Sequence, residues 1–85
     1  MRLPVIKHIN KFIAANDADY ISEAIEVLEH LSESPTIKDE ELDVMGELLS
    51  NLYGALEVQA LIKDGQTERE ALNAFMKRVV GAIDK

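Results

Sequence analysis

The stretch DVMGELLSNLYGALEV, Asp43 to Val58, decides the fold that this sequence predicts. Apolar residues recur at helical spacing through it, and no proline interrupts the pattern between about residue 37 and residue 63. A helix of about 26 residues is about 39 Å long, whereas a globule of 85 residues is only about 30 Å across. We therefore expect one long central helix, residues 37–63, that overruns its own domain.

Gly46 and Gly54 are unexpected inside such a helix, because each glycine costs about 0.5 to 1 kcal/mol relative to alanine. With Ser50 they recur at every fourth position and form a ridge of small side chains, along which another helix can approach closely. That helix could belong to a second copy or to the same chain, and a small ligand could also take the place. We favour a symmetric homodimer whose long helices cross here. The residues expected at this dimer contact or close helix packing are Met45, Gly46, Leu49, Ser50, Tyr53 and Gly54.

Three shorter helices complete the prediction. Pro4 suits a first helical position and opens a helix over residues 4–15. Asn16 or Asp17 can cap the second helix, which ends at Ser34 and Pro35. The fourth helix follows the capping box Thr67 to Glu70 in TERE.

The central helix also carries signals at both ends. Thr36 and Asp39 approximate a capping box at its start, and Gly65 supplies a left-handed residue just after its end. No strand pattern competes anywhere. The predicted fold class is all-α, a compact bundle of four helices in one domain over residues 1–85.

Charge is unevenly distributed along the chain, whose net charge is −7. Residues 1–16 hold three bases and no acid, whereas residues 17–57 hold twelve acids and one base. An acidic middle repels phosphate backbones, so nucleic acid is not an expected partner. The ordinary interpretation of the acidic block is a solvated surface.

The chain contains no cysteine and no run of about 18 apolar residues. It therefore has no thiol chemistry and no expected membrane span. The first residues lack the apolar core of a secretory signal, so we expect a cytoplasmic location.

Few residues in the sequence indicate catalysis or metal binding. Glu26 and His30 lie four apart, but they fall on the polar side of the second helix, where water should surround them. Glu47 and Glu57 border the long helix and are expected at a rim. We predict no catalytic residue, no metal ligand and no cofactor.

The segments PTIKDEELDVMGELLSNLYGALEV and ALNAFMKRVVGAID together resemble a family of short, uncharacterised, all-helical bacterial proteins that carry a domain of unknown function. The resemblance covers nearly the whole chain. It implies no catalytic residues.

The sequence thus predicts a small cytoplasmic interaction or regulatory module, a homodimer with a possible protein partner. The alternative is a ligand-binding or metal-binding protein, or an enzyme, that uses carboxylates at the dimer interface. Burial of those carboxylates in a cleft would favour the alternative.

Overall fold

The long helix is the element that every other helix contacts. In the computed structural model, which describes residues 2–83 and the side chains of residues 2–79, four helices follow one another. They are α1 (Leu3–Ala15), α2 (Asp19–Leu31), α3 (Asp39–Lys63) and α4 (Glu68–Ile83). The predicted all-α fold with four helices is confirmed, and the long helix starts two residues later than predicted.

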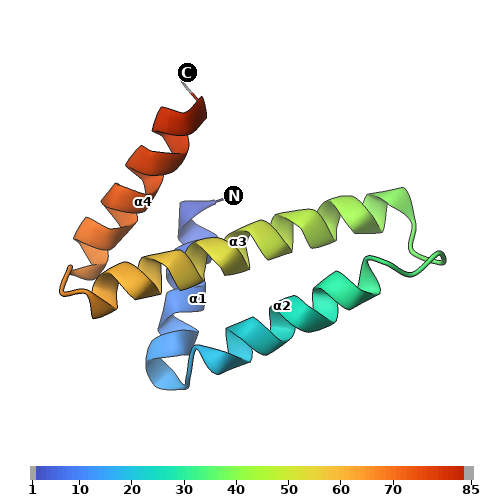
Figure 1. Cartoon of the computed structure of the whole chain (residues 1–85), viewed down its shortest axis with the longest axis horizontal. Coiled ribbons are helices and arrows are strands. Elements are labelled where there is room, and N and C mark those ends of the chain that lie inside the picture. The colour runs from blue at the N-terminus through green and yellow to red at the C-terminus, as the bar shows by residue number, and fades with distance from the viewer. Residues whose placement is uncertain (1, 84–85) are drawn as a thin grey trace.

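The arrangement is open rather than bundled (Figure 1). Helix α2 runs back along α3, whereas α1 crosses behind α3 and α4 leaves its C-terminal end at an angle. The radius of gyration is 13.9 Å, compared with about 12 Å for a compact globule of this length. The sequence predicted a compact bundle, and the structure is more open because α1 and α4 cross α3 instead of running beside it.

Local sequence sets the ends of the helices. The N–H of Thr67 donates to Glu70 at 2.9 Å and the N–H of Glu70 donates to the Thr67 hydroxyl at 3.1 Å, which confirms the predicted capping box of α4. Gly65, after α3, has a φ of 107°, a left-handed conformation that glycine adopts without strain.

The cap of α3 differs from the prediction. The Glu41 carboxylate accepts a hydrogen bond from the N–H of Lys38 at 2.9 Å. This side-chain cap therefore forms two residues beyond the expected pair of Thr36 and Asp39. The Thr36 hydroxyl instead lies 2.8 Å from the Ser34 hydroxyl in the preceding loop. The loop therefore uses its own side chains in a turn, and α3 begins later.

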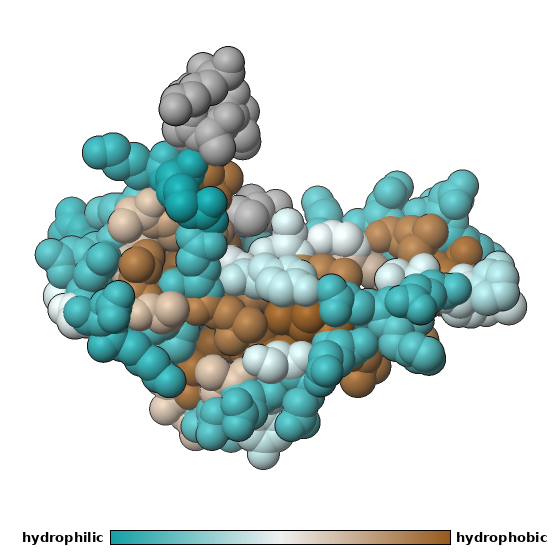
Figure 2. Space-filling model, in the orientation of Figure 1, coloured by the Kyte–Doolittle hydropathy of each residue, from teal (hydrophilic) through white to brown (hydrophobic). Residues whose placement is uncertain are grey.

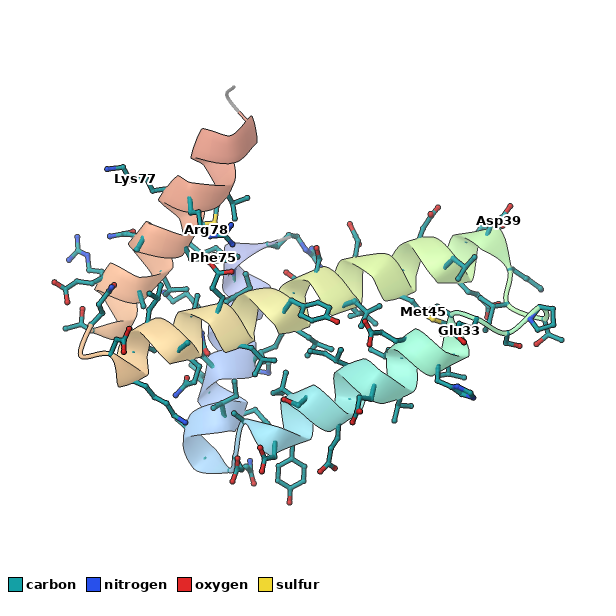
Figure 3. The ribbon with its side chains drawn as sticks, viewed as in Figure 1. Glu33, Asp39, Met45, Phe75, Lys77 and Arg78 are labelled. Atoms are coloured by element: carbon teal, nitrogen blue, oxygen red, sulfur yellow. The ribbon has the colours of Figure 1, made fainter. Side chains whose placement is uncertain are left out.

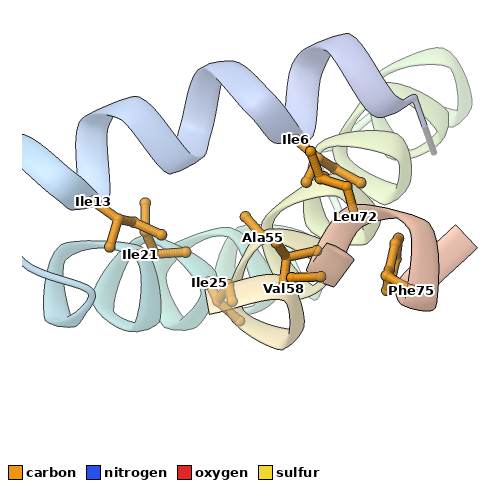
Figure 4. Packing of buried hydrophobic residues seen from close by; sticks show 9 residues of the cluster. Ile6, Ile13, Ile21, Ile25, Ala55, Val58, Leu72 and Phe75 are labelled. Carbon is orange, nitrogen blue, oxygen red and sulfur yellow. The ribbon is translucent and has the colours of Figure 1, made fainter. Parts of the chain in front are cut away.

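The core lies where α1, α2 and α4 meet the C-terminal half of α3 (Figure 4). Among the described side chains, nine buried apolar residues form one cluster, and Phe75, Ile6 and Val58 are its largest fully buried members. The whole cluster is Ile6, Ile13, Ile21, Ile25, Ala55, Val58, Ala71, Leu72 and Phe75. On α3 it ends at Ala55, and the N-terminal half of that helix contributes only half-buried side chains to it.

Two buried asparagines, each 3% exposed, differ in their hydrogen bonds. Asn51 on α3 accepts the Arg2 N–H at the start of α1 at 2.8 Å and donates to the Glu47 carbonyl at 2.9 Å. Among the described residues, neither side-chain polar atom of Asn10 on α1 has a hydrogen-bond partner. Asn51 therefore fastens the start of α1 to α3, whereas no described residue compensates the burial of the Asn10 amide.

This difference gives a matched test of the packing. We expect Asn10→Leu to raise the free energy of unfolding by about 1 to 3 kcal/mol, because it removes an unsatisfied buried amide. Asn51→Leu should lower it by about 1 kcal/mol or more, since the start of α1 loses its acceptor. Urea unfolding followed by circular dichroism measures both. Stabilisation by both substitutions would contradict the role given to Asn51.

Candidate interaction surface

The two glycines of α3 lie in different surroundings. A Cβ atom added at Gly54 would lie 3.0 Å from Ile6 Cδ1 of α1 and 3.0 Å from Phe75 Cζ of α4. A Cβ atom added at Gly46 would meet no atom of a neighbouring side chain or helix within 4 Å among the described residues. Gly54 therefore allows α1 and α4 to pack closely on α3 within one chain, whereas Gly46 lies open on the surface.

The other residues predicted at this contact also differ in their exposure to solvent. Met45, Leu49 and Ser50 are half-buried, and Leu49 packs against the core cluster. Tyr53 is 49% exposed. Gly54 is therefore enclosed by close packing within the chain, whereas the other five predicted residues keep exposed surface.

Tyr53 nevertheless has a polar partner across the seam between α2 and α3. Its hydroxyl donates to Glu29 Oε2 at 2.6 Å. This hydrogen bond to a carboxylate, with desolvation and the nearby negative charge, raises the pKa of Tyr53 above its ordinary value of 10.0. The bond stabilises the fold below pH 10 and is lost as the pH rises through the raised pKa.

A titration tests this contact. In the Tyr20→Phe protein, Tyr53 is the only tyrosine, and its absorbance at 295 nm should titrate with a midpoint above 10. The added substitution Glu29→Gln should lower that midpoint, since it removes the charge that opposes ionisation. An unchanged midpoint would show that the pair is not formed in solution.

The carboxylates considered for chemistry do not converge. Glu26, His30 and Glu47 are exposed. Glu57 lies against α4, where Arg78 donates from Nε at 2.6 Å and from Nη2 at 2.5 Å to its two oxygens. Among the described residues, no group of three acidic, histidine or cysteine side chains is placed to hold a metal ion.

Arg78 instead joins helices. Its side chain spans from Glu57 to the ring of Phe75, whose centroid lies 5.8 Å from the guanidinium carbon. Figure 3 shows Arg78 and Phe75 together beside α3, with Lys77 pointing away from it. The Arg78 side chain is 60% exposed. The ion pair with Glu57 therefore orients α4 more than it stabilises the fold.

Helices α1 and α2 enclose a shallow pocket that the sequence did not indicate. Its volume is about 390 Å³. Two of its lining residues, Phe12 and Tyr20, meet edge to face, with ring centroids 5.6 Å apart. The lining residues are His8, Ile9, Phe12, Tyr20, Ile21 and Ala24. The spacing of these residues predicts which side of each helix is apolar, but it does not predict the angle between α1 and α2. The sequence alone therefore contains no signal for this pocket.

Large apolar side chains remain exposed along the same half of the molecule. Figure 2 shows hydrophobic surface along the seam of α2 and α3, bordered by hydrophilic surface. The exposed large apolar residues are Phe12, Tyr20, Val27, Leu31, Leu42, Val44, Leu48 and Tyr53. These residues lie on more than one side of the molecule, and so many exposed apolar side chains on a small protein are typical of an interaction site.

These features define an all-α protein built on one long helix, with an apolar surface and no converging polar site among the residues described. The chain belongs to the family described as "Family of unknown function (DUF6952)", which matches residues 1–84. This confirms the resemblance to a family of unknown function. No curated protein and no solved structure matches the chain significantly. Within residues 2–83, none of the helices combines the length and the apolar character needed to cross a bilayer.

Proposed function

We propose that this protein is a small interaction or regulatory module that works as a homodimer through α3. The observation that carries the proposal is the amount of uncovered surface. The chain exposes 6099 Å², whereas a globular monomer of 9.5 kDa exposes about 5,000 Å². The excess of about 1,000 Å² is close to the roughly 800 Å² that each partner buries in a stable interface.

The polar groups support the same function over the alternative. A ligand-binding or catalytic role needs convergent polar groups in a cleft. Here Glu26, His30 and Glu47 face water, and Glu57 is occupied by Arg78. The pocket between α1 and α2 is lined mainly by apolar side chains. The partner that fits is a protein surface, and the acidic middle of the chain disfavours nucleic acid. The cytoplasmic location expected from the sequence belongs to this proposal, and cell fractionation tests it.

Light scattering coupled to gel filtration tests the homodimer. We expect a mass of twice the 9.5 kDa of one chain at micromolar concentration, with dissociation on dilution. A mass of one chain at all concentrations would reject the homodimer. The interaction module would then need a different partner.

A further inference from the structure

The hairpin formed by α2 and the N-terminal half of α3 (residues 39–52) has two sides that contacts distinguish. The bond between Tyr53 and Glu29 marks one side. The other side is marked by α1, because Arg2 bonds to Asn51, and Tyr20 of α2 lines a pocket with residues of α1. Figure 1 shows α1 behind α3, so this second side faces away from the viewer.

On α2, the exposed apolar residues continue along the side that α1 occupies. Val27 and Leu31 lie seven and eleven positions after Tyr20, which are two and three helical turns. They are 59% and 43% exposed. The stripe that begins in contact with α1 therefore runs on, uncovered, to the end of α2.

On α3, the residues that face the core continue in the same way. Val44 and Leu48 lie eleven and seven positions before Ala55, which is fully buried. They are nevertheless 56% and 46% exposed. The stripe is thus apolar along its whole length, but α1 crosses α3 and covers it only from about Asn51 onward.

We propose that a second copy of this chain covers this side of the hairpin, the face formed by Val27, Leu31, Val44 and Leu48. The inference rests on the proposed homodimer and gives its interface. Two such hairpins, packed face to face, place four helices around one apolar layer, as in a four-helix bundle. A symmetric dimer brings the same patch of each chain together. The face carries apolar side chains from both of its helices, so each of the four helices can contribute to the buried layer.

The charges indicate how the two hairpins are oriented. Residues 17–57, which contain the hairpin, hold twelve acids and one base. Residues 1–16, which contain α1, hold three bases and no acid. Hairpins with their tips together would bring acid against acid. An antiparallel arrangement instead places the acidic tip of each copy beside the basic α1 of the other, which electrostatic complementarity favours.

Two residues on the exposed part of α3 test the face directly. Val44 lies on the proposed face and Leu42 on the side of Tyr53, and both are exposed in one chain. Glutamate at either position should leave the monomer folded, which circular dichroism verifies. We expect Val44→Glu to weaken the dimer at least tenfold, because the charge is buried twice in a symmetric interface. Leu42→Glu should change the dissociation constant less than threefold.

The outcomes separate the interface from the dimer itself. A dimeric Val44→Glu protein, or equal dissociation of both variants, would overturn this face while the homodimer stands. A monomeric wild-type protein would reject the homodimer and this interface with it. For the orientation, Lys11→Glu should weaken the dimer in low salt and Lys77→Glu on α4 should not, with the difference lost in high salt. Equal effects of the two lysine substitutions would overturn the antiparallel arrangement.

Discussion

Gly54→Leu is expected to destabilise the protein by at least about 1 to 3 kcal/mol, although leucine favours helices over glycine by most of 1 kcal/mol. The first carbon of any side chain at this position already lies 3.0 Å from Ile6 and from Phe75. Leucine adds three further carbons to this contact, so α1 or α4 must move away from α3. Chemical unfolding measures the loss.

Gly46→Leu is the matched control, because a Cβ added there would meet no neighbouring side chain or helix within 4 Å among the described residues. It should stabilise α3 by up to about 1 kcal/mol through helix propensity alone. Opposite changes in the free energy of unfolding at these two positions of one helix would separate the effect of packing from the effect of helix propensity. A Gly54→Leu protein as stable as Gly46→Leu would contradict the packing of α1 and α4 on α3.

Phe75→Ala is expected to cost about 3 to 5 kcal/mol, the usual range for a buried phenylalanine. Phe75 is 1% exposed and lies in the one cluster of buried apolar residues described here. A domain of this size has a total stability of about 5 to 10 kcal/mol, so the variant should lose about half of it and its Tm should fall by at least about 12 °C. Thermal unfolding followed by circular dichroism is the measurement.

Lys77→Ala, two residues along α4, serves as the control because Lys77 is exposed. It should change the free energy of unfolding by less than about 0.5 kcal/mol. If Phe75→Ala behaved like Lys77→Ala, then α4 would not be packed on α3 in solution, and its apolar stripe would be free.

The helices could be predicted from the sequence because their signals are local. Pro4 at a first turn, the Thr67 to Glu70 capping box and Gly65 after the long helix each act within a few residues. The cap of α3 was placed too early. Serine and threonine hydroxyls also bond to each other in turns, as Ser34 and Thr36 do here, and spacing alone does not distinguish these uses.

The crossing angles could not be predicted, and the meaning of Gly54 depends on them. A ridge of small residues indicates that a helix approaches closely, but it does not say which helix. The sequence left open both a second copy and the same chain, and the structure places α1 and α4 at Gly54. Asn51 was missed for the same reason, because its role depends on where the start of α1 lies.

The exposed stripe on the hairpin follows from the same geometry. In sequence, Val44, Leu48 and Ala55 belong to one apolar face. The crossing of α1 divides this face into a covered part and an uncovered part. As a result, α3 carries more apolar surface than the other helices of one chain cover.

Contacts between methyl groups of two chains test this account most directly. In an equal mixture of isotope-labelled and unlabelled protein, filtered nuclear Overhauser spectra report only contacts between chains. We expect them from the methyl groups of Val44 and Leu48 of one copy to those of Val27 and Leu31 of the other. Contacts between chains at Leu42 and Leu49 instead, or none at concentrations where the protein is fully associated, would contradict the proposed interface.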